Sequence, residues 1–409
     1  TAPAFGEDDY NTGRRYDLPV VNPVDEQGKY TDTPWAGRFV MEEGLDIDII
    51  KWLAAEDKIF AKEKMEHNYP HCWRCGTPLV YYAKPSWYIE MTKLKDQLVA
   101  NNNTVNWFPD FVGEKRFGNW LENVNDWAIS RNRYWGTPIP IWRCECGHLE
   151  CIGSRAELVE KAQENITEDI ELHRPYVDDV HLTCPECGKP MTRIPEVMDC
   201  WFDSGAMPFA QQHYPFENSE KFDEEMFPAD FICEGIDQTR GWFYSLMAIS
   251  TFIKGKAPYK TVITHGMIVD EERQKMSKSL GNGIAPEDIL KQYGADVMRL
   301  WVASSDYRQD MRISKDMLKH LSQNYLKIRN TARYILGNLF DFDPKTNAVA
   351  YADMPELDKW ALMKLNDLAA KVREGYDSYE FHTVFHAIHN FCVVDMSNFY
   401  LDVIKDRLY

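Results

Sequence analysis

The sequence has 409 residues, 44% of them hydrophobic, and its 46 lysine and arginine residues against 64 aspartate and glutamate residues give a formal charge of −18. This length predicts about two to four domains, and the composition excludes a disordered chain. The acidic balance disfavours non-specific binding to nucleic acid, although a local basic groove can still serve that purpose. No apolar run is long enough to cross a bilayer, and no secretory signal pattern is visible.

The first 140 residues carry a mixed pattern of secondary structure. Residues 17–32 predict short strands and turns, and residues 44–63 have apolar positions at helical spacing. Residues 69–140 are rich in tryptophan, tyrosine and proline, which predicts extended segments and loops. The chain opens without a methionine and closes inside an expected amphipathic helix, so we expect an internal piece of a longer protein.

A βαβ pattern follows. Residues 230–235 predict a strand that runs into a polar loop, residues 238–254 a buried helix, and residues 259–269 a β-branched strand. This alternation predicts a parallel sheet covered by helices, with ligands at the carboxyl ends of its strands. The stretches "EGIDQTRGW" and "HGM" fall at these ends. From residue 314 onward the pattern predicts a helical bundle.

Four cysteines form two close pairs separated by a long spacer. The pairs are Cys144 with Cys146 and Cys184 with Cys187. Without a sign of secretion, such pairs favour a tetrahedral zinc site over disulfides. His148 or Cys151 could replace one ligand, and ordinary buried cysteines are the alternative. A further pair, Cys72 and Cys75, makes one knuckle with no clear partner.

The stretch "QKMSKSLGN" at residues 274–282 predicts a short cationic loop. Its two lysines, Lys275 and Lys278, could fold over a triphosphate and neutralise charge that develops on the phosphates. The plainer alternative is a solvated turn before the helix expected from "APEDILKQYG". The position favours the first interpretation, because the loop follows a strand that ends in "THGM".

The loop "KMSKS" is similar to the second signature of the class I aminoacyl-tRNA synthetases. Further stretches resemble the isoleucyl-tRNA synthetases over essentially the whole chain: "TAPAFGEDDY", "HCWRCGTPLVYYAKPSWY", "WAISRNRYWGTPIP", "CWFDSG" and "EGIDQTRGWF". The valyl enzymes are the close alternative. The first signature of the family, "HIGH", is not found in the sequence. The stretch "HTVFH" at residues 382–386 does not qualify, because it lies in an expected C-terminal helix.

The resemblance implies an α/β protein with a Rossmann-like parallel-sheet catalytic core, a zinc-knuckle insertion, an editing-domain remnant and a C-terminal helical bundle. The expected parts are the end of the editing domain and its connection (1–70), a catalytic segment with the CxxC knuckle (71–140), the zinc-knuckle insertion (141–192), the second half of the catalytic core (193–273), the KMSKS loop with a stem-contact region (274–316) and the start of the helical anticodon-binding domain (317–409).

The same resemblance implies that ATP with Mg²⁺ activates isoleucine to the adenylate, which is then transferred to tRNA(Ile). Lys275 and Lys278 would be catalytic, meeting the phosphates. The residues expected to bind ATP and the adenylate are Glu234, Gly235, Asp237, Gln238, His265, Gly266, Met267, Met276 and Ser277. Trp201 and Trp242 would wall the isoleucine pocket, although either could simply be a core residue.

Other residues receive roles from the resemblance. Asp9 would grip the α-amino group of mischarged valine during editing, or else be a capping or turn acid. Cys72 and Cys75 would be half of a second zinc site. Arg116 and Arg131 lie in basic, aromatic stretches that suit either an acceptor strand or a core with salt bridges.

The resemblance further implies a cytoplasmic, monomeric enzyme with no membrane partner, and this chain alone is expected to be inactive. The rivals are a non-catalytic zinc scaffold that binds tRNA or a protein partner, and a nucleotidyl transferase with the same core. A scaffold has no need of an intact "KMSKS" loop, which argues against the first rival. The helical C-terminal part argues against the second.

Overall fold

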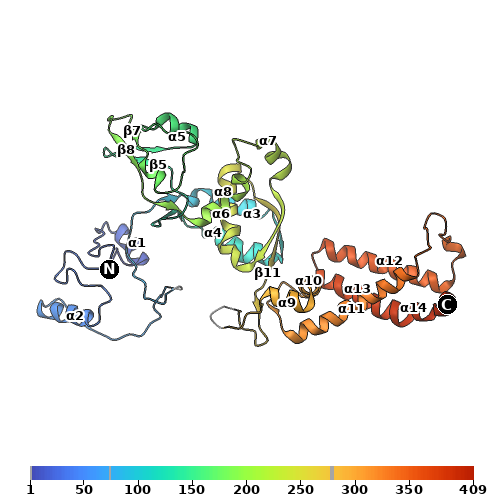
Figure 1. The fold of residues 1–409 in the computed structure, drawn as a ribbon. Coiled ribbons are helices and arrows are strands. Elements are labelled where there is room, and N and C mark those ends of the chain that lie inside the picture. Colours follow the sequence, from blue (N-terminus) through green and yellow to red (C-terminus); the bar gives the residue numbers. More distant parts are fainter. Residues whose placement is uncertain (1, 73–74, 277–280) are drawn as a thin grey trace. The chain divides into compact units, whose positions relative to one another are not determined.

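The computed structural model of the chain describes residues 2–72, 75–276 and 281–409. The chain forms two compact units, Thr1–Trp87 and Tyr88–Tyr409, whose helices and strands are labelled in Figure 1. Every named strand of the described residues, from β1 (Tyr88–Ile89) onward, belongs to the second unit. No helix in the described part of the chain is long and apolar enough to cross a membrane.

The first unit contains two helices, α1 (Glu7–Arg15) and α2 (Leu45–Ala55), joined by turns. The sequence pattern missed α1, whose acidic first turn and basic last turn complement the helix dipole. The helix expected over 44–63 ends at Ala55. The strands expected over 17–32 are reduced to isolated bridges, one of which joins Val24 to Tyr30.

The second unit is built on a parallel sheet with strand order β10-β11-β2. Its strands are β10 (Ala229–Gly235), β11 (Tyr259–His265) and β2 (Asn106–Phe108). The helix α8 (Trp242–Lys254) connects β10 to β11, as the βαβ pattern predicted. The central strand β11 is almost entirely buried, which is typical of a parallel strand covered on both faces.

Short helices cover this sheet where loops had been expected over residues 69–140. They are η1 (Met91–Leu94), α3 (Lys95–Asn102), η2 (Val112–Phe117) and α4 (Gly118–Glu122). Helices this short are not stable by propensity alone. Packing stabilises them, because Leu98, Phe117 and Leu121 are fully buried against the same core as Trp107 and Phe243.

An antiparallel sheet with strand order β6-β5-β8-β7 carries the cysteine pairs. Its strands are β5 (Ile141–Arg143), β6 (Leu149–Cys151), β7 (Leu182–Thr183) and β8 (Pro190–Arg193), with the helix α5 (Arg155–Lys161) and the turn η3 (Tyr176–Asp179) beside them. We call residues 139–194 the cysteine subdomain. It has a core of its own around Trp142 and Leu158.

Short pairs of strands and helices connect this subdomain to the parallel sheet. They are β3 (Trp127–Ala128), which pairs with β1, β4 (Ser130–Arg131), which pairs with β9 (Val197–Met198), and the helices α6 (Cys200–Ala210), α7 (Ser219–Lys221), η4 (Phe222–Met226) and η5 (Ile236–Arg240). The helix α6 packs against α8 so closely that a Cβ at Gly205 would be 2.6 Å from the carbonyl oxygen of Ser245.

After β11 the described residues are mostly helical, and helices had been predicted from residue 314 onward (Figure 1). The elements are β12 (Ile268–Val269) paired with β13 (Met311–Arg312), α9 (Pro286–Tyr293), α10 (Ala295–Ser304), α11 (Lys315–Gly337), η6 (Tyr351–Asp353), α12 (Glu356–Asp377), α13 (Phe381–Asn390), η7 (Phe391–Tyr400), α14 (Leu401–Val403) and α15 (Lys405–Leu408). The long helix α11 begins at its cap Ser314, whose side chain accepts a hydrogen bond from the Met317 N–H at 3.2 Å.

Candidate functional site

The carboxyl ends of β10 and β11 bring together residues that were expected to bind ATP and the adenylate. In the parallel pairing, Gly235 lies opposite His265. The Asp237 side chain lies over Gly235, since a Cβ at that glycine would be 2.5 Å from Asp237 Oδ1 and 3.7 Å from His265 Cε1. Glu234 and Asp237 are both exposed. This edge therefore offers two carboxylates and an imidazole at the place where parallel sheets bind ligands.

The loop after β11 is fixed by close backbone packing. A Cβ at Gly266 would be 2.4 Å from the carbonyl carbon and oxygen of Gln309, so no other residue fits there without movement. The Met267 N–H donates to Asp310 Oδ1 at 2.8 Å. His265 Nδ1 lies 2.8 Å from the Gly266 carbonyl oxygen. The imidazole of His265 is thus anchored at the end of its strand.

Gln238 ties the adenylate residues to the proposed pocket wall. Its Oε1 accepts a hydrogen bond from the Trp242 N–H at 2.9 Å, at the start of α8. Its Nε2 donates to Asp237 Oδ2 at 3.3 Å. One amide therefore links the carboxylate of Asp237 to the backbone at the start of α8.

The two tryptophans proposed for the isoleucine pocket lie at the first turns of α6 and α8. Trp201 is 41% exposed, and a Cβ at Gly241 would be 3.0 Å from its Cη2 atom. Trp242 is half-buried, and its Nε1–H donates to the Ser204 carbonyl oxygen at 3.0 Å. Trp201 is therefore not a core residue, whereas Trp242 packs against the core cluster around Phe243, so the plainer interpretation stays open for it.

The described part of the "KMSKS" stretch consists of Lys275 and Met276, and the predictions for Ser277 and Lys278 concern positions outside the described residues. Lys275 is exposed, and its backbone forms an isolated bridge with Val269. Met276 packs against the apolar cluster that includes Ile313. The lysine is therefore presented to solvent from an anchored backbone.

Asp270 closes the base of this loop and was missed in the sequence. Its carboxylate accepts hydrogen bonds from the Gln274 N–H at 2.7 Å and from Asn282 Nδ2 at 2.8 Å. The hydrogen bonds from Asn282 and then from the Gln274 backbone lower the pKa of Asp270 below its ordinary value. The signal for it was an aspartate before a polar run, a common turn former.

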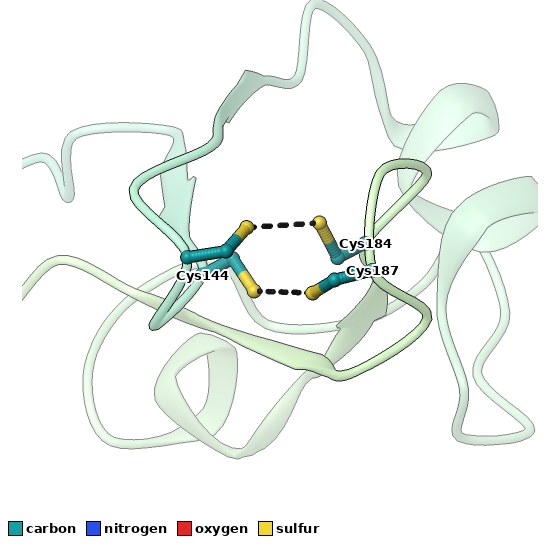
Figure 2. A group of neighbouring side chains, drawn as sticks. Cys144, Cys184 and Cys187 are labelled. Carbon is teal, nitrogen blue, oxygen red and sulfur yellow. Dashed lines mark hydrogen bonds between the residues drawn. The ribbon is translucent and has the colours of Figure 1, made fainter.

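The four cysteines of the subdomain form one cluster, as predicted. Their sulfurs all lie within 4.8 Å of one another. The Sγ–Sγ distance is 3.3 Å between Cys144 and Cys187 and 3.7 Å between Cys146 and Cys184. Figure 2 shows the sulfurs of Cys184 and Cys187 facing those of the first pair. Burial opposes ionisation of the Cys184 thiol, but backbone N–H groups of Cys187 and Glu186 outweigh it and lower its pKa to about 7.

The two substitute ligands considered in the sequence are outside this cluster. His148 instead interacts with two carboxylates, Glu150 at 3.4 Å and Glu186 at 3.2 Å. Cys151 is exposed on β6, and burial with nearby carboxylates raises the pKa of its thiol. Within the described residues the cluster is therefore made of cysteines alone.

Cys72 and Cys75 have the backbone of a second knuckle. The Cys72 N–H donates to the Thr77 carbonyl at 2.8 Å and its carbonyl accepts from the Gly76 N–H at 2.8 Å. The Cys184 turn repeats both bonds at the same sequence spacing, to residues 189 and 188, at 2.9 Å each. A hydrogen bond with the Thr77 hydroxyl lowers the pKa of Cys75 to about 7. No third ligand among the described residues completes a cluster here.

Two arginines considered for an acceptor strand make intramolecular contacts. Arg131 pairs with the buried Asp199 at 2.6 Å. Arg116 Nε donates to the Thr239 hydroxyl at 3.0 Å, beside η5. Arg116 is exposed and the Arg131 side chain is 42% exposed, so these contacts are compatible with either interpretation. Asp199 itself was not singled out in the sequence.

Asp9, the proposed editing residue, belongs to the first unit. It lies half-buried in the first turn of α1, together with Glu7 and Asp8. The cap of this helix is Gly6, which offers no side chain, so Asp9 is not a capping acid. A carboxylate in a first helical turn interacts favourably with the dipole, whatever else it binds.

Family models match most of the chain. The model "tRNA synthetases class I (I, L, M and V)" matches residues 20–314, and the model "Anticodon-binding domain of tRNA ligase" matches residues 358–409. Among curated proteins, the chain is 49% identical to an "Isoleucine--tRNA ligase" of Clostridium novyi, with 100% of this chain and 39% of that protein covered. It is 47% identical to "Isoleucine--tRNA ligase 2" of Bacillus anthracis, with 100% and 40% covered. The chain thus spans about two fifths of the length of these relatives.

Solved structures show the same fold at low identity. The methionyl-tRNA synthetase of Mycobacterium tuberculosis bound by methionyl-adenylate matches with a TM-score of 0.57 and 17% identity, over 83% of this chain and 57% of that chain. A LeuRS of Agrobacterium radiobacter K84, in a ternary complex with tRNA and LeuAMS, matches with a TM-score of 0.53 and 21% identity, over 69% and 37%. These two likenesses establish the fold alone.

Proposed function

This chain belongs to the class I tRNA synthetases of the I, L, M and V group, and we propose that it is part of an isoleucyl-tRNA synthetase. The observation that carries the choice of amino acid is identity of 46–49% over nearly the whole chain to relatives named as isoleucine–tRNA ligases. A valyl-type enzyme and a non-catalytic scaffold are not favoured by these relatives. A nucleotidyl transferase is not favoured by the family match.

The proposed reaction begins with ATP as its Mg²⁺ complex. The isoleucine carboxylate attacks the α-phosphorus and pyrophosphate leaves, so negative charge grows on the leaving group. Lys275, exposed on its anchored backbone, and Lys278 would neutralise this charge. Met276 and Ser277 would shape the loop that carries them. A hydroxyl of the terminal adenosine of tRNA(Ile) then attacks the adenylate carbonyl, and AMP leaves.

The edge formed by β10 and β11 would hold the nucleotide. Exposed carboxylates at Glu234 and Asp237 suit the ribose hydroxyls, which donate hydrogen bonds. The remaining residues proposed for ATP and the adenylate are Gly235, Gln238, His265, Gly266 and Met267. This assignment is supported by the pairing of Gly235 with His265 and by the bridge that Gln238 makes.

Trp201 and Trp242 would wall the side-chain pocket. Support comes from their position at facing helix starts, with the backbone of Gly241 close to Trp201. A wall of this kind rejects a side chain one methylene smaller only weakly, isoleucine against valine being the usual illustration. We therefore propose that Asp9 belongs to the editing function, where it would hold the α-amino group of mischarged valine.

We propose that Cys144, Cys146, Cys184 and Cys187 bind one structural zinc. Tetrahedral coordination with Zn–S bonds of about 2.3 Å requires sulfurs about 3.8 Å apart. The Cys146–Cys184 distance of 3.7 Å matches this value, the Cys144–Cys187 distance of 3.3 Å is shorter, and all four sulfurs lie within 4.8 Å of one another, so the donor set fits after small side-chain shifts. Cys72 and Cys75 would contribute half of a second zinc site, and its other ligands would come from residues outside this 409-residue sequence or from another chain.

The six parts expected from the sequence remain proposals for the domain organisation. The match of residues 358–409 to an anticodon-binding domain supports tRNA as the partner. We further propose a cytoplasmic monomer that binds tRNA(Ile), isoleucine and ATP.

The decisive test is ATP–pyrophosphate exchange by a full-length enzyme that contains this chain. Exchange should depend on isoleucine, with valine a weaker substrate and leucine and methionine weaker still. Charging of tRNA(Ile) in the same preparation should follow. Exchange that prefers valine would favour the valyl alternative, and no exchange with any amino acid would favour the scaffold.

A further inference from the structure

Asp199 is a buried carboxylate that lies between several donors. It is 5% exposed. Its Oδ2 accepts from Arg131 at 2.6 Å and from Trp127 Nε1 at 3.4 Å, while its Oδ1 accepts from the Trp201 N–H at 3.1 Å. Its own N–H donates to the Ile129 carbonyl at 2.7 Å. A buried carboxylate is costly unless it is paired in this way, so the arrangement calls for a role.

These bonds determine where α6 begins. Asp199 is the N-cap of α6, and the Trp201 N–H that it satisfies belongs to the second helical residue. Arg131 holds the cap from the other side and donates to the Ala128 carbonyl at 2.9 Å as well. The first turn of α6 is therefore bonded to the β4 region through one side chain.

Trp201 depends on this first turn for its position. Its side chain is 41% exposed, and its outer edge lies so close to the backbone of Gly241 that a Cβ there would be 3.0 Å from Cη2. A small rotation of the α6 start would move the indole away from Gly241. Trp242, by contrast, is held by hydrogen bonds at its backbone N–H and at its indole.

We infer that Asp199 is a positioning residue for amino-acid selection, which orients Trp201 by capping α6 while Arg131 fixes the cap. The inference rests on the proposed function, since it assigns Trp201 to the isoleucine pocket. Asp199 does not touch the substrate. It acts on KM for the amino acid and on the preference for isoleucine over valine, not on the chemical step.

The experiment compares three variants of the full-length enzyme in ATP–pyrophosphate exchange. Asp199→Ala should raise KM for isoleucine on the order of tenfold and lower the isoleucine-to-valine preference several-fold, with kcat within about twofold, because uniform binding is lost. Asp199→Ser retains a good N-cap and should recover most of the loss. Ser154→Ala removes the cap of α5, where Ser154 accepts from the Glu157 N–H at 3.1 Å, and should change neither quantity.

A merely structural role for Asp199 has a different signature. It would lower kcat through a smaller active fraction and leave KM and the preference unchanged, and that result would overturn the inference. The same would follow if Asp199→Ser were no better than Asp199→Ala.

A second readout separates this inference from the proposed function. The chain is labelled with 5-fluorotryptophan, and the ¹⁹F signal of Trp201 is assigned with Trp201→Phe. In Asp199→Ala this signal should shift or broaden more than those of the other tryptophans, and in Ser154→Ala it should not. Absence of isoleucine-dependent exchange in the unmodified enzyme would refute the proposed function while leaving this readout valid. An unchanged Trp201 signal in Asp199→Ala would refute the positioning role.

Discussion

The cysteine subdomain and the parallel sheet differ in how much of their apolar surface the described residues bury. The subdomain buries Trp142 and Met191 inside four strands and gathers all four sulfurs from its own turns. The sheet buries its central strand β11, but β10 is an edge in the described residues and leaves Phe231 57% exposed. The proposed metal ligands thus all come from turns of one subdomain, whereas the sheet that carries the proposed nucleotide edge is open along β10 in the described residues.

The largest expected effect concerns catalysis by the 409-residue chain alone. We expect no measurable adenylate formation, because the sequence holds no "HIGH" stretch and the proposed nucleotide edge includes Gly235, which ends the edge strand β10. The measurement is isoleucine-dependent ATP–pyrophosphate exchange, with a full-length enzyme as the positive control. If the chain formed adenylate at the full-length rate, its own residues would suffice for adenylate formation, and the expectation would be wrong.

Loss of the cysteine cluster is expected next in size. Cys184→Ser should abolish retention of zinc, where the unmodified chain keeps one ion after dialysis against a weak chelator, and the subdomain should lose protection from proteolysis, because metal binding is coupled to folding. Metal analysis and limited proteolysis measure both effects. Cys151→Ser is the matched control, since Cys151 is exposed outside the cluster, and it should retain the ion. A folded subdomain without metal would mean that these are ordinary core cysteines.

A smaller effect is expected at the base of the loop. Asp270→Ala removes the acceptor for Gln274 and Asn282 and should slow adenylate formation on the order of tenfold in a full-length enzyme. The folded-state pKa of Asp270 is lowered, so its contribution is present above the ordinary aspartate pKa and is lost only as pH falls through the lower folded value. The ratio of unmodified to variant rates should therefore stay constant from about pH 6 to 9. Substitution of the neighbouring exposed Glu271 by alanine should change the rate little.

The smallest effect is expected when substitutions on the buried strand β11 and on the edge strand β10 are compared. Val262→Ala on β11 should lower the free energy of unfolding by about 2 kcal/mol, because Val262 is fully buried. Phe231→Ser on β10 should change it by less than about 1 kcal/mol, because the Phe231 side chain is 57% exposed. Denaturant unfolding of the unmodified chain and of both variants measures the two changes. Equal losses of stability would mean that β10 is as well covered as β11.

Much of the parallel sheet and of the cysteine cluster could be predicted from the sequence. The strands at 230–235 and 259–269 and the helix between them follow from apolar runs, and the cysteine cluster follows from close spacing. The helices α1, α3 and α4 were missed, since short helices owe their stability to tertiary packing, as shown by the burial of Leu98 and Leu121.

Candidate site residues could be predicted where they belong to a local sequence motif. They could not be predicted where their contacts join residues far apart in the sequence. Gly235 and His265 end neighbouring strands and Gln238 follows the first of them, so the strand pattern placed them together, and their roles remain predictions. Asp199 was missed because its partner Arg131 is 68 residues away in the chain. Arg131 had two open interpretations, and the structure adds its contact with a buried carboxylate, which the sequence did not reveal.

We propose that the loop carrying Lys275 binds the phosphates of ATP, while Trp201 and Trp242 bind the amino acid. Pre-steady-state adenylate formation and isoleucine binding, measured side by side for Lys275→Ala in a full-length enzyme, separate the two roles. We expect a loss of rate on the order of a hundredfold, about 3 kcal/mol of transition-state stabilisation, with isoleucine affinity unchanged. Equal losses in rate and affinity, or no loss of rate, would contradict it and would make the loop a solvated turn.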